Sequence, residues 1–461
     1  MSILGAFVLP HPPLILPEVG QGKEIEIQKT IDAYREASRR VAALKPDTIV
    51  LVTPHSVLYA DYFHISPGRR AEGDLRRFSP RAPGVKVTYD TDFVSALSQN
   101  ASQANLPAGT QGERDAKLDH ATVIPLRFVE ESYQSHQLVR IGVSGFPLSD
   151  HYRLGQSVAR TSEQLSRKTV LIASADLSHH LKSDGPYDFA PEGPAFDKQI
   201  TAAMASGDFS RFLQFPPDFS EKAGECGLRP CVVLAGALDR REVRAELLSY
   251  EGPFGVGYAV AAFAPAGQSE ERAFLDRFLV EEQTRMKAIK AKEDPYVRLA
   301  RHALESYIQS GKTAKAPPDL PADMTARRAG VFVSLKKHGE LRGCIGTIAP
   351  GSDNIAAEIC RNAVSAAAED PRFDPVRPDE LDQLVYSVDV LDAPEPIDSP
   401  DMLDVSRYGV IVTSGRKRGL LLPNLDGVDT VARQVDIAKQ KAGIKPGESY
   451  QLERFEVTRH T

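Results

Sequence analysis

The chain has 461 residues, of which 42% are hydrophobic and 26% charged, with a formal net charge of −6 and a pI near 6.0. This length predicts two or three domains of a globular protein, and the slightly acidic balance argues against a broad basic face for nucleic acid or anionic lipid. No apolar run reaches the roughly 18–20 residues of a membrane span. The first apolar segment, residues 3–10, is too short for a secretion signal and lacks a charged start. We therefore expect a cytoplasmic protein.

The first 265 residues alternate short β-branched runs with helical stretches. We expect strands at residues 3–10, 48–53, 138–144, 169–175, 243–250 and 256–264, and helices at 24–44, 150–167 and 194–207. This alternation predicts an α/β fold with a mostly parallel central sheet flanked by helices.

Proline, glycine and polar residues at 262–271 break this pattern and predict a domain boundary. A charged helix at 269–293 then predicts a connecting segment, which we place at 266–293 between a first domain at 1–265 and a second at 294–461. In the second domain we expect an α+β fold: a helix at 295–311, a hairpin at 330–348 around His338 and Gly339, a helix at 352–370, a strand at 384–391 and a hairpin at 408–423.

Three histidines stand where expected strands end, namely His11, His55 and His179. In open parallel sheets, ligands gather beyond the carboxyl ends of the strands. A fourth, His120, follows Asp119, a residue suited to capping a short helix. Each histidine alone is typical of a solvated or hydrogen-bonded side chain, but their shared position favours one common site.

Two histidines and one carboxylate are typical ligands of non-haem Fe(II) in oxygenases. The candidate carboxylate is Glu225, which we expect near a helix N-terminus, where an anion is stabilised. Cys226 beside it is a softer competitor for the same position, and the segment also suits a plain buried helix start. Pro10 and Pro12 restrict the backbone on both sides of His11 and so predict a preset loop.

The four cysteines form no C-x-x-C pair, which argues against a zinc ribbon. We expect all of them, Cys226, Cys231, Cys344 and Cys360, to be reduced thiols.

The motifs FVLPHPPLILPEVG, TIVLVTPHS, LDHATVIPL, SADLSHH and GECGLRPCVVLAGAL occur in this order over residues 1–265. In this set the chain resembles the class III extradiol ring-cleavage dioxygenases, including the large-subunit type of protocatechuate 4,5-dioxygenase, and the related Memo-type proteins. The resemblance implies Fe(II), or another divalent metal, and a small catecholic aromatic substrate. It implies His11, His55 and Glu225 as metal ligands, His179 as the catalytic acid/base and His120 as a substrate contact. The chain has no tryptophan, and its CGLRP run is closer to the Memo-type pattern.

In the second half, LRGCIGT at 341–347, together with AEDPRF at 368–373, resembles the AMMECR family. Members occur beside Memo-type and radical-SAM proteins in the AmmeMemoRadiSam system, which implies a radical-SAM partner. Gly343 and Gly346 around Cys344 allow close backbone approach. Cys344 is either a nucleophile paired with His338 or, as we favour, a strand cysteine packed between glycines.

These features favour an Fe(II)-dependent extradiol-type dioxygenase fused to an AMMECR domain. One alternative is a metal-binding partner of a radical-SAM enzyme without ring-cleaving activity. A second is a zinc hydrolase, although the additional aspartates typical of two-metal sites are missing. Whether the chain forms a homo-oligomer stays open.

Overall fold

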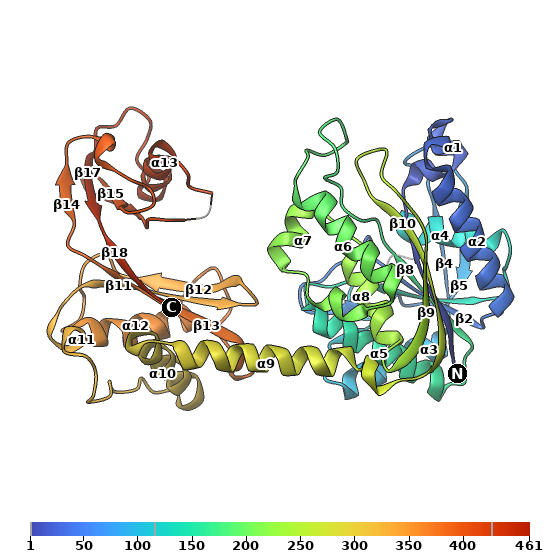
Figure 1. The fold of residues 1–461 in the computed structure, drawn as a ribbon, viewed down its shortest axis with the longest axis horizontal. Coiled ribbons are helices and arrows are strands. Elements are labelled where there is room, and N and C mark those ends of the chain that lie inside the picture. Colours follow the sequence, from blue (N-terminus) through green and yellow to red (C-terminus); the bar gives the residue numbers. More distant parts are fainter. Residues whose placement is uncertain (1, 115–116, 426) are drawn as a thin grey trace. The chain divides into compact units, whose positions relative to one another are not determined.

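A computed structural model describes residues 2–114, 117–425 and 427–461 (Figure 1). The chain divides into two compact units, Met1–Val280 and Glu281–Thr461. Within the described residues, no helix has the length and apolar character needed to cross a membrane.

The first unit is built on a six-stranded sheet in the order β7-β2-β8-β1-β10-β9. Its strands are β1 (Ile3–Leu9), β2 (Thr48–Thr53), β7 (Gln137–Gly142), β8 (Thr169–Ser174), β9 (Arg241–Glu251) and β10 (Tyr258–Gln268). β1, β2, β7 and β8 are parallel to one another, whereas β10 runs antiparallel to β1 and β9 antiparallel to β10. The α/β fold with a largely parallel sheet is therefore confirmed, with two antiparallel strands at one edge.

Helices cover both faces of this sheet because its parallel strands are apolar on both sides. Val50 and Val52 of β2 join one hydrophobic core, whereas Ile49 and Leu51 join the other. The first core contains residues of α3, α5, α6 and α8, and the second contains residues of α2 and α4. In Figure 1, α2 and α4 lie on one side of the sheet and α6 and α8 on the other.

The helices of this unit are α1 (Pro17–Gly20), α2 (Gln28–Leu44), α3 (Thr91–Gln103), α4 (His120–Glu130), α5 (Leu148–Gln164), α6 (Glu192–Ser206), α7 (Pro217–Ala223) and α8 (Leu228–Ala237). Two small two-stranded sheets join β3 (Phe63–His64) to β6 (Ala108–Gly109) and β4 (Arg70–Asp74) to β5 (Gly84–Thr88). None of the expected strands covers these small sheets.

The expected break at 262–271 does not end the strand, since β10 continues to Gln268. β1 pairs with β10 only up to Phe263, so beyond this point β10 pairs with β9 alone. Pro265, which has no N–H to donate, is tolerated where one side of a strand is unpaired. The division between the units falls later, inside α9 (Phe274–Lys292), so the expected connecting segment 266–293 is split between them. Independent folding of the units stays a prediction.

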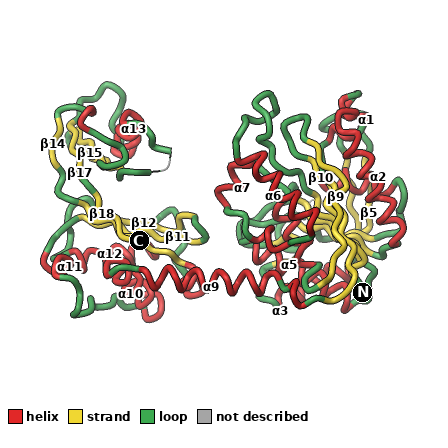
Figure 2. Tube along the Cα trace, viewed as in Figure 1, coloured by secondary structure: helices red, strands yellow, loops and turns green. Residues whose placement is uncertain are grey.

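The second unit contains two antiparallel four-stranded sheets, β12-β11-β13-β18 and β14-β17-β15-β16. Their strands are β11 (Gly330–Lys337), β12 (Glu340–Gly346), β13 (Leu384–Leu391), β14 (Glu395–Ile397), β15 (Gly409–Ser414), β16 (Lys417–Leu421), β17 (Gln451–Phe455) and β18 (Val457–His460). Its helices are α10 (Pro295–Ser310), α11 (Ala322–Ala326), α12 (Ile355–Ala368) and α13 (Val431–Ala442). Figure 2 shows α10, α11 and α12 gathered beside the first sheet. Both expected hairpins are present; at the turn between β11 and β12, His338 and Gly339 have φ values of 54° and 89°, as a two-residue hairpin loop requires.

Candidate metal centre

The carboxyl ends of the parallel strands bring three imidazole rings together. His11 follows β1, His55 follows β2 and His120 begins α4. The ring centroids are 4.9 Å apart for His11 and His55, 5.4 Å for His11 and His120, and 4.5 Å for His55 and His120. His179, which follows β8, is near enough for its charge to affect His11. The topology of the sheet therefore assembles a cluster from segments far apart in the sequence.

His11 is the buried member of this cluster, with 1% of its surface exposed. Its backbone N–H donates to Oδ1 of Asp176 at 2.6 Å, and the Tyr34 hydroxyl donates to the Pro10 carbonyl at 2.6 Å. Pro12 on the other side is extended, with φ −67° and ψ 124°. The loop is thus fixed by proline geometry and by buried hydrogen bonds.

Asp119 positions the next two histidines. Its carboxylate accepts from the Thr122 N–H as the N-cap of α4, as expected, and also from the Thr53 hydroxyl at 2.8 Å. That hydroxyl in turn accepts from the His55 N–H at 3.1 Å. The end of β2 and the start of α4 are therefore tied together, and the rings of His55 and His120 stack.

The ligand atoms that gather around the histidines include the thiol of Cys226. Among the described residues, His11, His55 and Cys226 form a group whose ligand atoms all lie within 4.8 Å of one another. Nε2 of His11 is 3.1 Å from Nε2 of His55 and 3.5 Å from Sγ of Cys226. The start of α8 approaches β8 so closely that a Cβ on Gly227 would lie 2.7 Å from the Asp176 carbonyl oxygen. Only glycine permits this approach, which brings Cys226 to the histidines.

Glu225, the expected carboxylate ligand, is not part of this group. Its Oε2 accepts from the Leu228 N–H at 2.6 Å, at the start of α8. The position near a helix N-terminus was expected, but the free backbone donors of that terminus hold the carboxylate there. Burial nevertheless raises the pKa of Glu225 to about 7. The structure thus places Cys226, rather than Glu225, beside the two histidines.

The two distances from Nε2 of His11 fit a single divalent ion. With metal–nitrogen bonds of about 2.1 Å, two nitrogen ligands lie about 3.0 Å apart at a right angle and about 3.4 Å apart at the tetrahedral angle. With a metal–sulfur bond of about 2.3 Å, the sulfur–nitrogen distance is about 3.1–3.6 Å over the same angles. The observed 3.1 Å and 3.5 Å lie within these ranges.

The protonation states also suit metal binding. Burial, followed by repulsion from His55, His120 and His179, holds the pKa of His11 well below its usual range, and partial burial lowers the pKa of His55. Both rings are therefore neutral near pH 7, as a metal ligand must be. Burial raises the pKa of the Cys226 thiol, with further increases from Asp176 and Glu225. A bound cation would displace this proton.

The outer part of the cluster carries residues that the sequence patterns did not indicate. Nη2 of Arg77 donates to Nδ1 of His120 at 2.9 Å, and its guanidinium lies over the Phe78 ring. Tyr187 stacks on His179 with ring centroids 5.2 Å apart. Phe78 is 39% exposed and Tyr187 50% exposed, so two accessible aromatic rings flank the histidines. Tyr187 is close to His179 in the sequence, whereas Phe78 is far from His120, so no sequence pattern pointed to Phe78.

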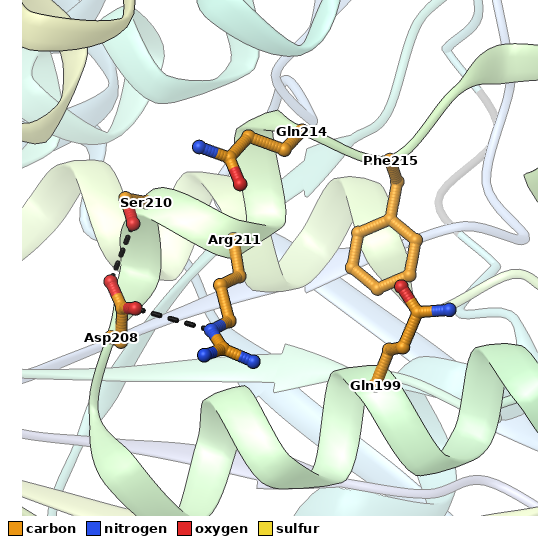
Figure 3. A pocket seen from close by; sticks show the side chains of 6 residues that line it. All are labelled: Gln199, Asp208, Ser210, Arg211, Gln214 and Phe215. Carbon is orange, nitrogen blue, oxygen red and sulfur yellow. Dashed lines mark hydrogen bonds and ion pairs between the residues drawn. The ribbon is translucent and has the colours of Figure 1, made fainter.

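A separate hollow of about 420 Å³ lies at α6 and the short helix at 209–213 (Figure 3). Its lining residues are Gln199, Asp208, Ser210, Arg211, Gln214 and Phe215. Asp208 accepts hydrogen bonds from Ser210 and Arg211, so its carboxylate is already engaged. None of the lining residues belongs to the histidine cluster.

In the second unit, the LRGCIGT segment forms β12 and its end, and its glycines serve close packing. A Cβ on Gly343 would lie 2.1 Å from the Ala366 carbonyl oxygen of α12, and one on Gly346 would lie 2.1 Å from the Phe332 ring. Cys344 pairs across the hairpin with Ser334, whose hydroxyl donates to its sulfur at 3.2 Å. Cys344 is six residues after His338, and its cross-strand partner Ser334 is four residues before His338, so about 13 Å of strand separates Cys344 from the turn. The structure therefore supports the packed strand cysteine and not a pair with His338; all four cysteines of the chain are free.

This α/β architecture, with histidines at the carboxyl ends of its parallel strands, agrees with the family comparison. Residues 5–261 match the family described as the catalytic LigB subunit of aromatic ring-opening dioxygenase, and the chain belongs to this family. Residues 297–460 match the AMMECR1 family, so a LigB-type domain is fused to an AMMECR1 domain.

The same combination extends over a full-length relative. Protein CA_C1420 of Clostridium acetobutylicum is 41% identical over 471 residues, which cover 100% of this chain and 99% of the relative. A Thermotoga maritima protein is 49% identical over 170 residues, covering 36% of this chain and 98% of its own length. Among solved structures, the uncharacterized protein JW3007 of Escherichia coli K12 is 16% identical with a TM-score of 0.38, covering 56% of this chain and 99% of that chain.

Proposed function

We propose that the first unit binds one divalent metal through His11, His55 and Cys226 and acts as an extradiol-type dioxygenase on a catecholic aromatic substrate. The observation that carries this proposal is the convergence of three ligand atoms, from three distant segments, within 4.8 Å of one another, with the two separations from His11 suited to a single ion. Membership of the ring-opening dioxygenase family supports an aromatic substrate. Fe(II) is the metal we propose first, because it supplies the redox chemistry that brings a catechol and dioxygen to one centre.

The surrounding residues have distinct roles in this proposal. Burial, with the nearby charges of His55 and His180, lowers the pKa of His179 to about 4, so its ring is neutral at pH 7 and able to accept a proton. His120 accepts from Arg77 at Nδ1 and therefore carries its own ring proton on Nε2. We assign His179 to proton transfer from the substrate hydroxyl and His120 to a hydrogen bond with a substrate oxygen. Phe78 and Tyr187 offer ring faces to a planar substrate.

One observation favours the alternative of a metal-binding partner for a radical-SAM enzyme. The usual ligand set of non-haem Fe(II) oxygenases is two histidines and a carboxylate, whereas Cys226 offers a softer thiolate. A thiolate ligand suits zinc or copper as well as iron. The Memo-type character of the CGLRP run agrees with this second reading, in which the metal does not open a ring.

The two functions are distinguished by loading the protein with Fe(II) without air, then adding a catechol and oxygen. We expect oxygen uptake and a yellow ring-fission product from the wild-type protein. His11→Ala and His55→Ala should lose most of the metal, measured by mass spectrometry, whereas the control His302→Ala on the exposed surface of α10 should keep it. Full metal content without ring opening across a panel of catechols would favour the partner protein, and unchanged metal in both ligand variants would rule out the site.

A further inference from the structure

Ser174, the last residue of β8, joins His11 to the first turn of α4. Its Oγ lies 2.9 Å from Nδ1 of His11 and 2.6 Å from the carbonyl oxygen of Ala121. The residue is completely buried, so these two partners are not exchanged for bulk water. A single hydroxyl therefore connects a candidate metal ligand to a helix backbone.

The protons of this arrangement can be assigned by counting donors. A serine hydroxyl has one hydrogen, and a carbonyl oxygen can only accept. At 2.6 Å from the Ala121 oxygen, the Ser174 hydrogen must be directed to that oxygen. The remaining lone pairs of Ser174 can then only accept, so Nδ1 of His11 carries a proton. Consequently Nε2 of His11 carries no proton, and its lone pair lies beside His55 and Cys226.

The Ala121 carbonyl is available because of a proline in the same helix. In an α-helix, the carbonyl of residue 121 accepts from the N–H of residue 125. Residue 125 is Pro125, inside α4, and it has no N–H. The buried carbonyl of Ala121 would be left without its helical donor, and the Ser174 hydroxyl takes that place.

We infer that Ser174 is a positioning residue that fixes the tautomer of His11 and directs Nε2 toward the metal, with Pro125 leaving the Ala121 carbonyl free to anchor the serine. The metal-directed part of this inference rests on the proposed function. The tautomer itself is a property of the metal-free protein. A histidine ligand is generally held by a hydrogen bond to its other nitrogen, and loss of that partner typically costs 10–100-fold in metal affinity.

The first experiment measures the tautomer without metal. Long-range proton–nitrogen correlation spectra of the protein labelled with ¹⁵N in its 11 histidines, at mildly alkaline pH, identify which nitrogen of each ring is protonated. The His11 signals are assigned by their loss in His11→Gln. We expect Nδ1–H in the wild-type protein and in Ser174→Thr, which keeps the hydroxyl, and a mixture of both tautomers in Ser174→Ala. An Nε2–H form of His11 in the wild-type protein would overturn the inference, whatever the variants do.

The second experiment measures Zn²⁺ affinity by competition with a chromophoric chelator. We expect a loss of about 10–100-fold in Ser174→Ala, with affinity retained in Ser174→Thr. The matched control is Ser38→Ala, which removes another buried hydroxyl, one with no hydrogen-bond partner among the described residues. Equal affinity of Ser174→Ala and Ser38→Ala would refute the positioning role. If the wild-type protein bound no metal but had the expected tautomer, the proposed function would fail while the proton assignment stood.

Discussion

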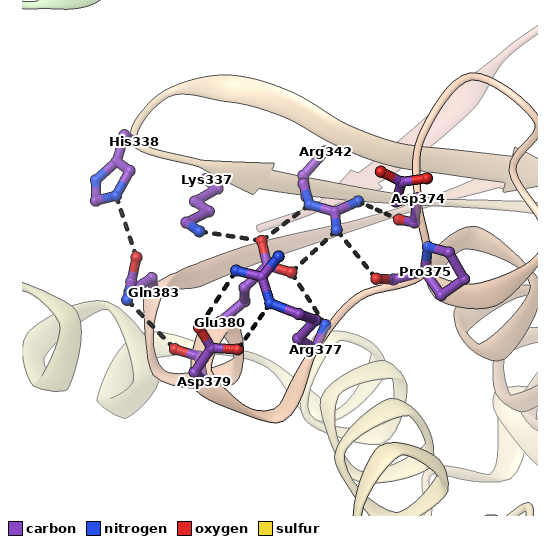
Figure 4. A network of polar contacts seen from close by, with 9 residues as sticks. All are labelled: Lys337, His338, Arg342, Asp374, Pro375, Arg377, Asp379, Glu380 and Gln383. Carbon is purple, nitrogen blue, oxygen red and sulfur yellow. Dashed lines mark hydrogen bonds and ion pairs between the residues drawn. The ribbon is translucent and has the colours of Figure 1, made fainter. Parts of the chain in front are cut away.

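The ion pair between Arg342 of the LRGCIGT segment and Glu380 provides a quantitative test of whether this segment stabilises the fold. Arg342 donates from Nε and Nη2 to the two carboxylate oxygens of Glu380, each at 3.0 Å (Figure 4). Lys337 and the Arg377 N–H donate to the same carboxylate at 3.0 Å. Glu380 is 3% exposed. The perturbation is Glu380→Gln, which keeps the shape of the side chain and removes its charge.

The expected loss of folding free energy in Glu380→Gln follows from the pKa of Glu380. Burial alone would raise this pKa, but hydrogen bonds from Arg342, the Arg377 backbone and Lys337 outweigh it and lower the pKa from 4.5 to about 2. At about 1.4 kcal/mol per pH unit, this lowering of the pKa corresponds to about 3 kcal/mol of folding free energy. This agrees with the 3–5 kcal/mol that is typical when one partner of a buried ion pair is removed. We therefore expect Glu380→Gln to destabilise the second unit by about 3 kcal/mol at pH 7.

The sign of the pH dependence follows from the lowered pKa. The unfolded chain takes up the Glu380 proton near pH 4.5, whereas the folded chain takes it up only near pH 2. The stabilisation that ionised Glu380 contributes to folding is thus fully present above about pH 4.5 and is lost as the pH falls toward 2. The difference between wild-type and variant proteins should shrink over this window.

Urea unfolding of the full chain, followed by far-ultraviolet circular dichroism between neutral and acidic pH, measures this difference. The matched control is Asp379→Asn in the same 3-10 helix, where the exposed pair with Arg377 should contribute less than about 1 kcal/mol. A loss below about 1 kcal/mol in Glu380→Gln at pH 7, or a loss independent of pH, would refute the structural role assigned to this contact.

Three further predictions concern the candidate site and the division of the chain. Cys226→Ala should lower the bound metal per chain, whereas Glu225→Gln should keep it; mass spectrometry of both purified variants decides between the two neighbours, and the opposite pattern would restore Glu225 as the ligand. His179→Gln should keep the metal while ring opening slows by roughly 10²–10⁴; loss of metal would make His179 a ligand, and full activity would remove it from the mechanism. A fragment of residues 294–461 should be soluble and unfold cooperatively, as a separate core predicts; an aggregated fragment beside a stable full chain would show that the units depend on each other.

The parts of the fold that the sequence predicts best are those with one consistent pattern. Residues 48–53 and 384–391 form strands with the expected bounds, because continuous or alternating apolar runs permit little else. The small sheets were not among the expected strands: the two-residue strands β3 and β6 are too short to show a period, and the β4 segment is largely polar, although β5 (GVKVT) alternates in burial. The clustering of the histidines could be predicted from the sequence because parallel strands place their carboxyl ends at one edge of the sheet.

Sequence reasoning does not decide between Glu225 and Cys226 as the third residue of the candidate site. Glu225 and Cys226 are neighbours in the turn between α7 and α8, and consecutive side chains there point in different directions. Which one faces His11 depends on the backbone of that turn, where Gly224 has a φ of 62° and Gly227 packs against the end of β8. The acidic side chain finds an alternative partner in the Leu228 N–H, and the thiol, which has weaker hydrogen-bonding demands, is left beside the imidazoles. Whether the proposed metal would meet a carboxylate or a thiolate thus depends on a difference of one residue, and tertiary packing rather than any sequence pattern sets that difference.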